Sequence, residues 1–133
     1  MPRSPATSLV LLLALAATGA LAADACETAT AQGRINQCAA AAAVTENDAL
    51  ERAYDAYRDS LAPAQQDRLK RTQLVWRMLR EATCDFESGG ISDGQVQGRL
   101  RSDCLARMTR ERAQAIRAWA ACRPGAAGCA PLK

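Results

Sequence analysis

The sequence contains no histidine and no Cys-x-x-Cys spacing. Thioredoxin-like redox sites and Cys/His zinc sites therefore lose their usual signatures, and acyl transfer loses its commonest general base. Aromatic residues make up only 4% of the chain. Its basic residues are interleaved with acids, so nothing favours nucleic-acid binding. We expect a protein that is not an enzyme and that needs no metal or cofactor.

The chain also lacks an apolar run of the roughly 20 residues that span a membrane. Its longest apolar segment, residues 9–22, follows a basic start and ends in the small-x-small site Ala20-Leu21-Ala22. These parts predict a secretory signal peptide over residues 1–22 and a mature product without a membrane span. A lipid anchor at Cys26 is the alternative, but Asp24 fits a lipobox poorly and disfavours it.

No segment alternates apolar and polar residues over strand length, whereas apolar residues recur at helical spacing. We predict an all-α fold, a small antiparallel three-helix bundle with helices over about residues 31–61, 64–86 and 99–121. Residues 45–48 are the weak point of the first helix and could split it, giving four helices. Pro63 should begin the second helix after a tight joint. Ser88-Gly89-Gly90 should end it, and residues 91–98 should form a loop or a short irregular helix.

Six cysteines lie outside the predicted signal peptide: Cys26, Cys38, Cys84, Cys104, Cys122 and Cys129. An even count in a short exported chain predicts three disulfides in an oxidising compartment, either the periplasm or the outside of the cell. The count leaves the connectivity open, but the expected positions on the helices favour the pairs 26–38, 84–104 and 122–129. Each bridge should stabilise the fold by roughly 2–4 kcal/mol. We expect one domain over residues 23–121 and a disulfide-closed tail over residues 122–133.

One stripe of the second predicted helix mixes side-chain types. Leu69, Gln73, Trp76, Arg80 and Cys84 recur at steps of three or four, which places them on one face. We interpret Leu69 and Trp76 as core, Arg80 as lying along the core edge, and Cys84 as half of a disulfide. On the third helix we expect one side to face the core, formed by Leu105, Met108, Ala115, Trp119 and Cys122.

Charge is divided unevenly along the chain. Residues 23–67 carry a net charge of −5, and residues 68–133 carry +7. Acidic and basic helices could pack side by side and neutralise each other, or the molecule could present a two-faced surface to a charged partner. The sequence leaves both readings open.

The motif Leu-x3-Gln-x2-Trp-x3-Arg-x3-Cys in an exported, cysteine-bearing helical chain resembles the lysozyme inhibitor LprI-like N-terminal domain family. The likeness covers about residues 26–119. It continues through Gly89-Gly90, Cys104-Leu105, Thr109, Arg112-Ala113 and Ile116. The chain departs from the family pattern at three places: Asn47 and Glu51 stand where the family has an aspartate and an asparagine, Thr72 replaces an alanine, and the last cysteine pair is an addition. The departures on the first helix put any polar contact made there in doubt.

The resemblance implies a periplasmic or surface protein that binds a protein partner, which for some members is a lysozyme. It also implies that Leu69, Gln73, Trp76, Arg80 and Arg112 are structural. An inhibitor could turn the acids Asp48, Glu51, Asp55 and Asp59 toward the basic lysozyme body. Candidate insert residues near the catalytic carboxylates are Arg80, Ser88, Gly89, Gly90 and Asp93. An immunity protein against a periplasmic toxin, or an envelope adaptor, would fit the same features.

Overall fold

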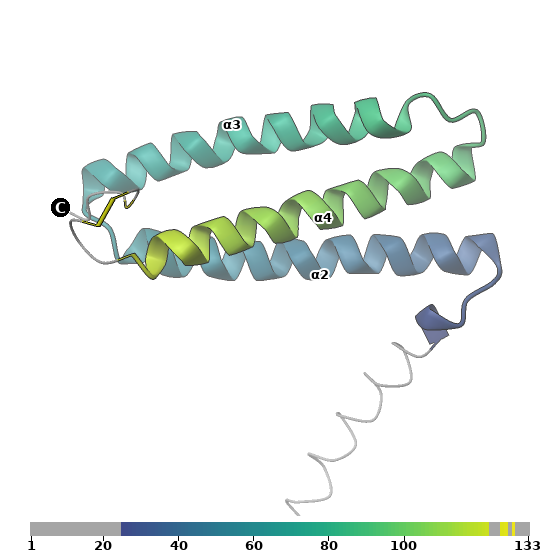
Figure 1. Cartoon of the computed structure of the whole chain (residues 1–133), viewed down its shortest axis with the longest axis horizontal. Coiled ribbons are helices and arrows are strands. Elements are labelled where there is room, and N and C mark those ends of the chain that lie inside the picture. The colour runs from purple at the N-terminus through teal and green to yellow at the C-terminus, as the bar shows by residue number, and fades with distance from the viewer. Residues whose placement is uncertain (1–24, 123–125, 128, 130–133) are drawn as a thin grey trace, which may run out of the picture.

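The computed structural model describes residues 25–122, 126, 127 and 129. Three long helices follow a helical turn at residues 25–27: α2 (Gln32–Asp59), α3 (Pro63–Ser88) and α4 (Gly94–Ala120). They run antiparallel to one another in chain order, and the described residues include no strand (Figure 1). The all-α prediction is therefore confirmed. The predicted signal peptide, residues 1–22, and most of the predicted tail lie outside the described residues, so those boundaries stay predictions.

The first predicted helix forms as a single element. Within its weak segment, the Thr45 hydroxyl donates a hydrogen bond to the Ala41 carbonyl oxygen at 3.0 Å. The Asn47 side-chain amide donates to the Glu51 carboxylate, also at 3.0 Å. Both bonds close within the helix, and the alanine-rich segment before them has high helix propensity. The split that we considered is therefore absent.

The joint between α2 and α3 forms as predicted. Pro63 takes the first position of α3, where a missing N–H leaves no hydrogen bond unmade. The Gln66 side-chain amide donates to the Leu61 carbonyl oxygen at 2.9 Å and braces the turn. At its other end α3 extends to Ser88, two residues beyond the predicted end. The Ser88 hydroxyl donates to the Cys84 carbonyl oxygen at 2.7 Å and supports this last turn.

The start of α4 corrects the sequence-based prediction. We expected a loop or a short irregular helix over residues 91–98, but residues 94–98 belong to the long helix α4, which begins at Gly94, and the loop shrinks to residues 89–93. Asp93 is the reason, because its side chain accepts hydrogen bonds from the backbone N–H groups of Gln95 at 2.9 Å and Val96 at 3.3 Å. This N-cap outweighs the low helix propensity of the glycines in the first turns.

Removing this cap should cost measurable stability. We expect Asp93→Ala to lower the free energy of unfolding by about 1 kcal/mol, because two backbone donors lose their acceptor. Asp93→Asn should cost much less, since asparagine caps helices about as well. Urea unfolding followed by circular dichroism compares the two variants. Equal losses for both would show that the charge of Asp93, and not its cap, matters.

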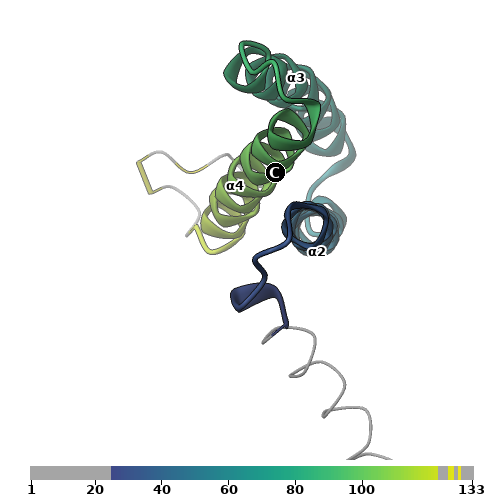
Figure 2. The same ribbon diagram turned by 90° about the vertical axis from the view of Figure 1, so that its right-hand side faces the viewer.

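The helices do not pack equally. α4 lies against both others, most extensively against α2, whereas α2 and α3 barely touch (Figure 2). The buried residues of α4 are Cys104, Ala106, Thr109, Ala113 and Ile116. The five residues that we expected on the core side are only half-buried. The reason is that α4 faces two neighbours at once. Its small residues, between the two contacts, allow close approach, and the larger ones lie to the side.

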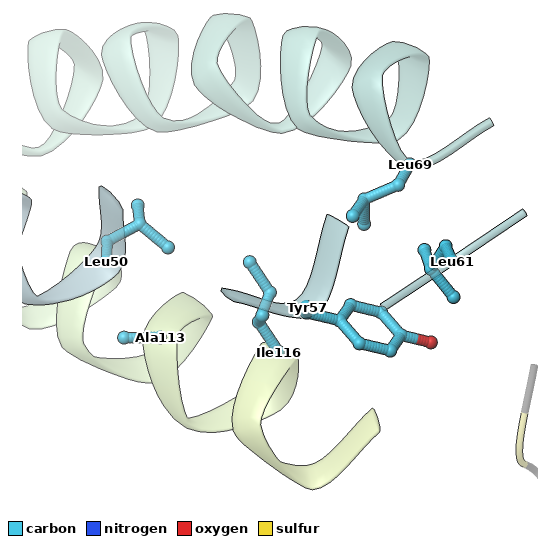
Figure 3. Packing of buried hydrophobic residues seen from close by; sticks show 6 residues of the cluster. All are labelled: Leu50, Tyr57, Leu61, Leu69, Ala113 and Ile116. Atoms are coloured by element: carbon cyan, nitrogen blue, oxygen red, sulfur yellow. The ribbon is translucent and has the colours of Figure 1, made fainter. Parts of the chain in front are cut away.

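The apolar core gathers at the end of the bundle where α2 joins α3 (Figure 3). Its buried members are Leu50, Tyr57, Leu61, Leu69, Ala113 and Ile116. Trp76 and Trp119 pack against this cluster, as do Ala53 and Tyr54. Burying each large apolar side chain contributes roughly 1.5–3 kcal/mol, so a core this small leaves a share of the stability to the disulfides.

Three disulfides join the described cysteines in the predicted pairs: Cys26–Cys38, Cys84–Cys104 and Cys122–Cys129. The bridge from Cys84 to Cys104 is buried and fastens α3 to α4. The first bridge ties the leading segment to α2. It also consumes the Cys26 thiol, which a lipid anchor would require.

Candidate partner-binding site

The mixed stripe of α3 faces inward, as predicted. Leu69, Gln73 and Cys84 are buried, and Trp76 is half-buried against the core. The Arg80 side chain is 16% exposed. Together these five residues form the surface that α3 presents to the rest of the bundle.

Arg112 of α4 contacts both the glutamine and the tryptophan of that stripe. Its guanidinium lies between two indole rings, 5.6 Å from the Trp76 centroid and 4.8 Å from that of Trp119. Its Nε donates to the Gln73 Oε1 at 3.0 Å. Burial lowers the pKa of Arg112, and its Nη2 atom is buried without a hydrogen-bond partner among the described residues. The group is therefore held mainly by the aromatic faces and by one hydrogen bond.

Arg80 extends the same stack. Its guanidinium lies 5.1 Å from the Trp76 centroid and donates to the Thr109 hydroxyl on α4 at 3.0 Å. It also pairs with Glu81 at 2.7 Å, and Arg101 of α4 reaches the same carboxylate at 2.7 Å. Burial by itself raises the pKa of Glu81, but the hydrogen bonds from the two arginines outweigh it and hold that pKa below its ordinary value. This network fastens α3 to α4.

The residues predicted to touch a partner divide into two groups, one packed within the bundle and one exposed on the loop between α3 and α4. Arg80 hydrogen-bonds to Thr109 in the α3–α4 interface, and Ser88 is buried. Gly89, Gly90 and Asp93 are exposed in the short loop. Of the residues predicted to insert into a lysozyme cleft, those in the loop over residues 89–93 are therefore the exposed ones. This loop is too short to extend far from the bundle.

The outward side of α2 carries an acidic stripe, formed by Asp48, Glu51, Asp55 and Asp59. All four are exposed and recur at steps of three or four, on the side of the helix opposite the core residues Leu50 and Tyr57. Arg58 lies at its edge and pairs with Asp55 at 2.7 Å and Asp59 at 2.8 Å. The hydrogen bonds that Arg58 donates to the Asp59 carboxylate raise the pKa of Arg58. The stripe keeps a net negative charge along one rigid helix.

The ion pairs decide between the two readings of the charge division. Among the described residues, a single ion pair joins the acidic half of the chain to the basic half, between Glu46 and Arg110 at 2.8 Å. The other basic side chains that form ion pairs do so within their own half of the chain, as Arg101 does with Asp85 and Arg107 with Glu87. The acidic stripe is therefore not neutralised through ion pairs with the basic helices, and it remains an exposed acidic region of α2.

A groove follows α2 and α3 where the two helices separate. It consists of two adjoining hollows of about 540 Å³ and 160 Å³. Both are lined by Tyr54, Gln73 and Arg77. Glu51 belongs to the α2 wall, and Lys70 to the α3 wall. Lys70 and Arg77 are exposed and form no ion pair with any other described residue. The groove therefore places free cations directly beside the acidic stripe.

Within residues 25–122 and the described part of the tail, no three His, Cys, Asp or Glu side chains are grouped in a way that could hold a metal ion. In the same residues, no helix has both the length and the apolar character needed to cross a membrane.

Sequence reasoning missed two surfaces. The groove arises from the divergence of α2 and α3, which no local pattern reveals. The second surface is the outward side of α3, where Leu74, Val75, Met78, Leu79 and Phe86 are exposed. A signal for it was present, because these residues also recur at helical spacing. They were overlooked because the mixed stripe on the other side carried the recognisable motif.

Comparisons with known proteins assign the chain to a family. No curated protein and no solved structure matches the chain. The sequence model of the family described as "Lysozyme inhibitor LprI" matches residues 22–116, which include all of α2 and α3 and most of α4. The chain therefore belongs to the lysozyme inhibitor LprI family.

Proposed function

We propose that this protein is exported to the periplasm or the medium, where it binds a lysozyme and inhibits it. Membership of the lysozyme inhibitor LprI family is the observation that carries the proposal. The three disulfides support export, because such bonds persist in oxidising compartments. The apolar segment at residues 9–22 supports a cleaved signal peptide.

The surface chemistry suits such a partner. C-type lysozymes are basic proteins whose catalytic cleft contains two carboxyl groups. The acidic stripe of α2 would attract the basic body and orient the encounter. Arg77 projects from the groove beside that stripe without an ion pair of its own. It would then approach the catalytic carboxylates, a role for which Arg80 has too little exposed surface.

The first experiment is a cell-wall lysis assay. The purified, oxidised protein is titrated into reactions containing either a C-type or a G-type lysozyme. A reduced and alkylated sample serves as the control, because losing the disulfides should unfold the binding surface. We expect inhibition of one enzyme type that disappears on reduction. If neither enzyme is inhibited, the proposal is wrong, and capture of partners from an envelope extract would test the immunity and adaptor roles.

A charge-reversal pair tests the proposed surface. We expect Asp48→Lys/Glu51→Lys to weaken inhibition about tenfold or more, because an attractive stripe becomes repulsive toward a basic enzyme. Asp103→Lys/Glu111→Lys is the matched control, since it reverses two exposed acids on α4 and changes the net charge equally. Equal weakening by both pairs would show that only net charge matters, and would remove the stripe from the binding site.

A further inference from the structure

The outward side of α3 is apolar over several turns. We call Leu74, Val75, Met78, Leu79 and Phe86 the outer face of α3. Their exposed fractions range from 57% for Leu79 to 86% for Phe86, which is the only phenylalanine in the chain. A monomeric soluble protein rarely leaves a contiguous apolar patch of this kind uncovered, so the face indicates an interaction surface.

This outer face lies on the opposite side of α3 from the mixed stripe. At about 100° per residue, the outer-face residues are centred roughly half a turn away from Leu69, Gln73 and Cys84. The helix therefore carries packing residues on both sides, a pattern typical of a helix that is covered on both. In the bundle only the inner side is covered, because α4 and the core lie there (Figure 2).

The area of the outer face suits a dimer. Five large apolar side chains at roughly 100 Å² apiece offer about 500 Å². The stems of flanking arginines and the exposed Ala82 would add to this. Interfaces of standard size bury about 800 Å² on each partner. Two copies meeting through α3 would therefore form an interface near the lower end of the specific range, with micromolar affinity.

The charges at the two ends of the face are opposite. Arg68 and Arg71 flank its N-terminal end, and neither forms an ion pair with another described residue. Asp85 flanks the other end next to Phe86. It pairs with Arg101, but 61% of its side chain stays exposed. The exposed part of the Asp85 carboxylate can accept a contact from an arginine of a second copy that is turned around, in addition to its pair with Arg101.

We propose that two copies of this chain form a symmetric dimer by packing the outer faces of α3 antiparallel. The two-fold axis lies at the level of Met78 and Leu79. In this register Val75 of one copy meets the small Ala82 of the other, and Arg71 meets the end that carries Asp85. The acidic stripe is on α2 and stays free in the dimer, whereas Leu74 lies at the edge that the outer face shares with the groove.

The charges beside the outer face of α3 argue against a lipid membrane as the surface that covers it. Helices that lie in membrane interfaces carry a predominantly basic polar side, which attracts anionic lipids. The acid at the Phe86 end of the outer face would be repelled there, whereas a second copy would supply arginines to it.

The test measures molar mass across a dilution series by analytical ultracentrifugation. We expect the wild-type protein to shift from dimer to monomer on dilution. Leu79→Glu should raise the dissociation constant by at least about tenfold, since it buries two charges at the axis. Val44→Glu is the matched control, because Val44 is exposed to a similar degree, 61% against 57% for Leu79, but lies on α2. Circular dichroism of both variants verifies the fold.

A second variant tests the symmetry. Met78→Cys places one thiol of each copy beside the axis, so a short thiol-reactive cross-linker should yield a covalent dimer; Val44→Cys should not. A wild-type protein that stays monomeric at high concentration would overturn the proposal. Binding of anionic vesicles, abolished by Leu79→Glu while the protein stays monomeric, would also overturn it and assign the face to a membrane surface.

Discussion

Replacing Cys84 and Cys104 together by alanine is expected to lower the free energy of unfolding by about 2–5 kcal/mol, the range for removing a native disulfide from a small domain. This bridge closes a loop of 20 residues and is buried at the end of the bundle where α3 meets α4. Since α3 has almost no contact with α2, the link to α4 is its main covalent and packing restraint at that end.

The measurement is urea unfolding of the double variant beside the wild-type protein. Cys122→Ala/Cys129→Ala is the control, because that bridge closes a loop of only 7 residues beyond the end of α4. We expect the control to lose less stability than the buried pair. Loop entropy alone accounts for a difference of about 1 kcal/mol between the two losses, so a larger difference would show that burial of the bridge contributes. Equal losses would contradict the prediction.

Arg112→Ala is expected to cost about 2–4 kcal/mol, through lost ring contacts and a lost hydrogen bond to a charged group. The guanidinium is held between Trp76 and Trp119, and it is the partner of the buried Gln73 side chain. Truncation would leave a cavity between the rings and a buried amide without its donor.

A double-mutant cycle separates the two effects. Arg112→Met keeps most of the volume but leaves Gln73 unpaired, whereas Arg112→Met/Gln73→Leu removes both polar partners. Because two apolar replacements can offset the loss of a buried polar pair, the double variant should lie within about 1 kcal/mol of the wild type. Thermal unfolding monitored by tryptophan fluorescence measures the stability of each variant. Additive losses would show that the arginine and the glutamine do not depend on each other.

The three helices use their outward sides differently. α2 turns acids outward, α3 turns apolar residues outward, and α4 lies against both of the others. This division gives one small bundle a charged surface and an apolar surface, which meet at Leu74, an outer-face residue that also lines the groove. The two proposals are tested by different variants, because charge reversal in the acidic stripe should change lysozyme inhibition and Leu79→Glu on the outer face of α3 should change molar mass.

The sequence by itself determined the helical class and the inward stripe of α3, because these features depend on local spacing: a period near 3.6 and a proline at a helix start. The disulfide pairs could be predicted only by also assuming that the helices run antiparallel, because six cysteines by themselves leave the connectivity open. The start of α4 at Gly94 was also within reach, since Asp93 is a strong N-cap residue. We gave the neighbouring glycines too much weight.

Only the tertiary structure decided what each surface can do. Arg80 and Arg77 are three residues apart and chemically identical. Arg80 hydrogen-bonds across the α3–α4 interface, whereas Arg77 lines the groove without an ion pair. The sequence could not separate them, because their roles depend on which helices diverge. α3 contacts α4 and hardly touches α2, and that packing arrangement covers most of one arginine, opens the groove beside the other, and leaves the outer face of α3 uncovered.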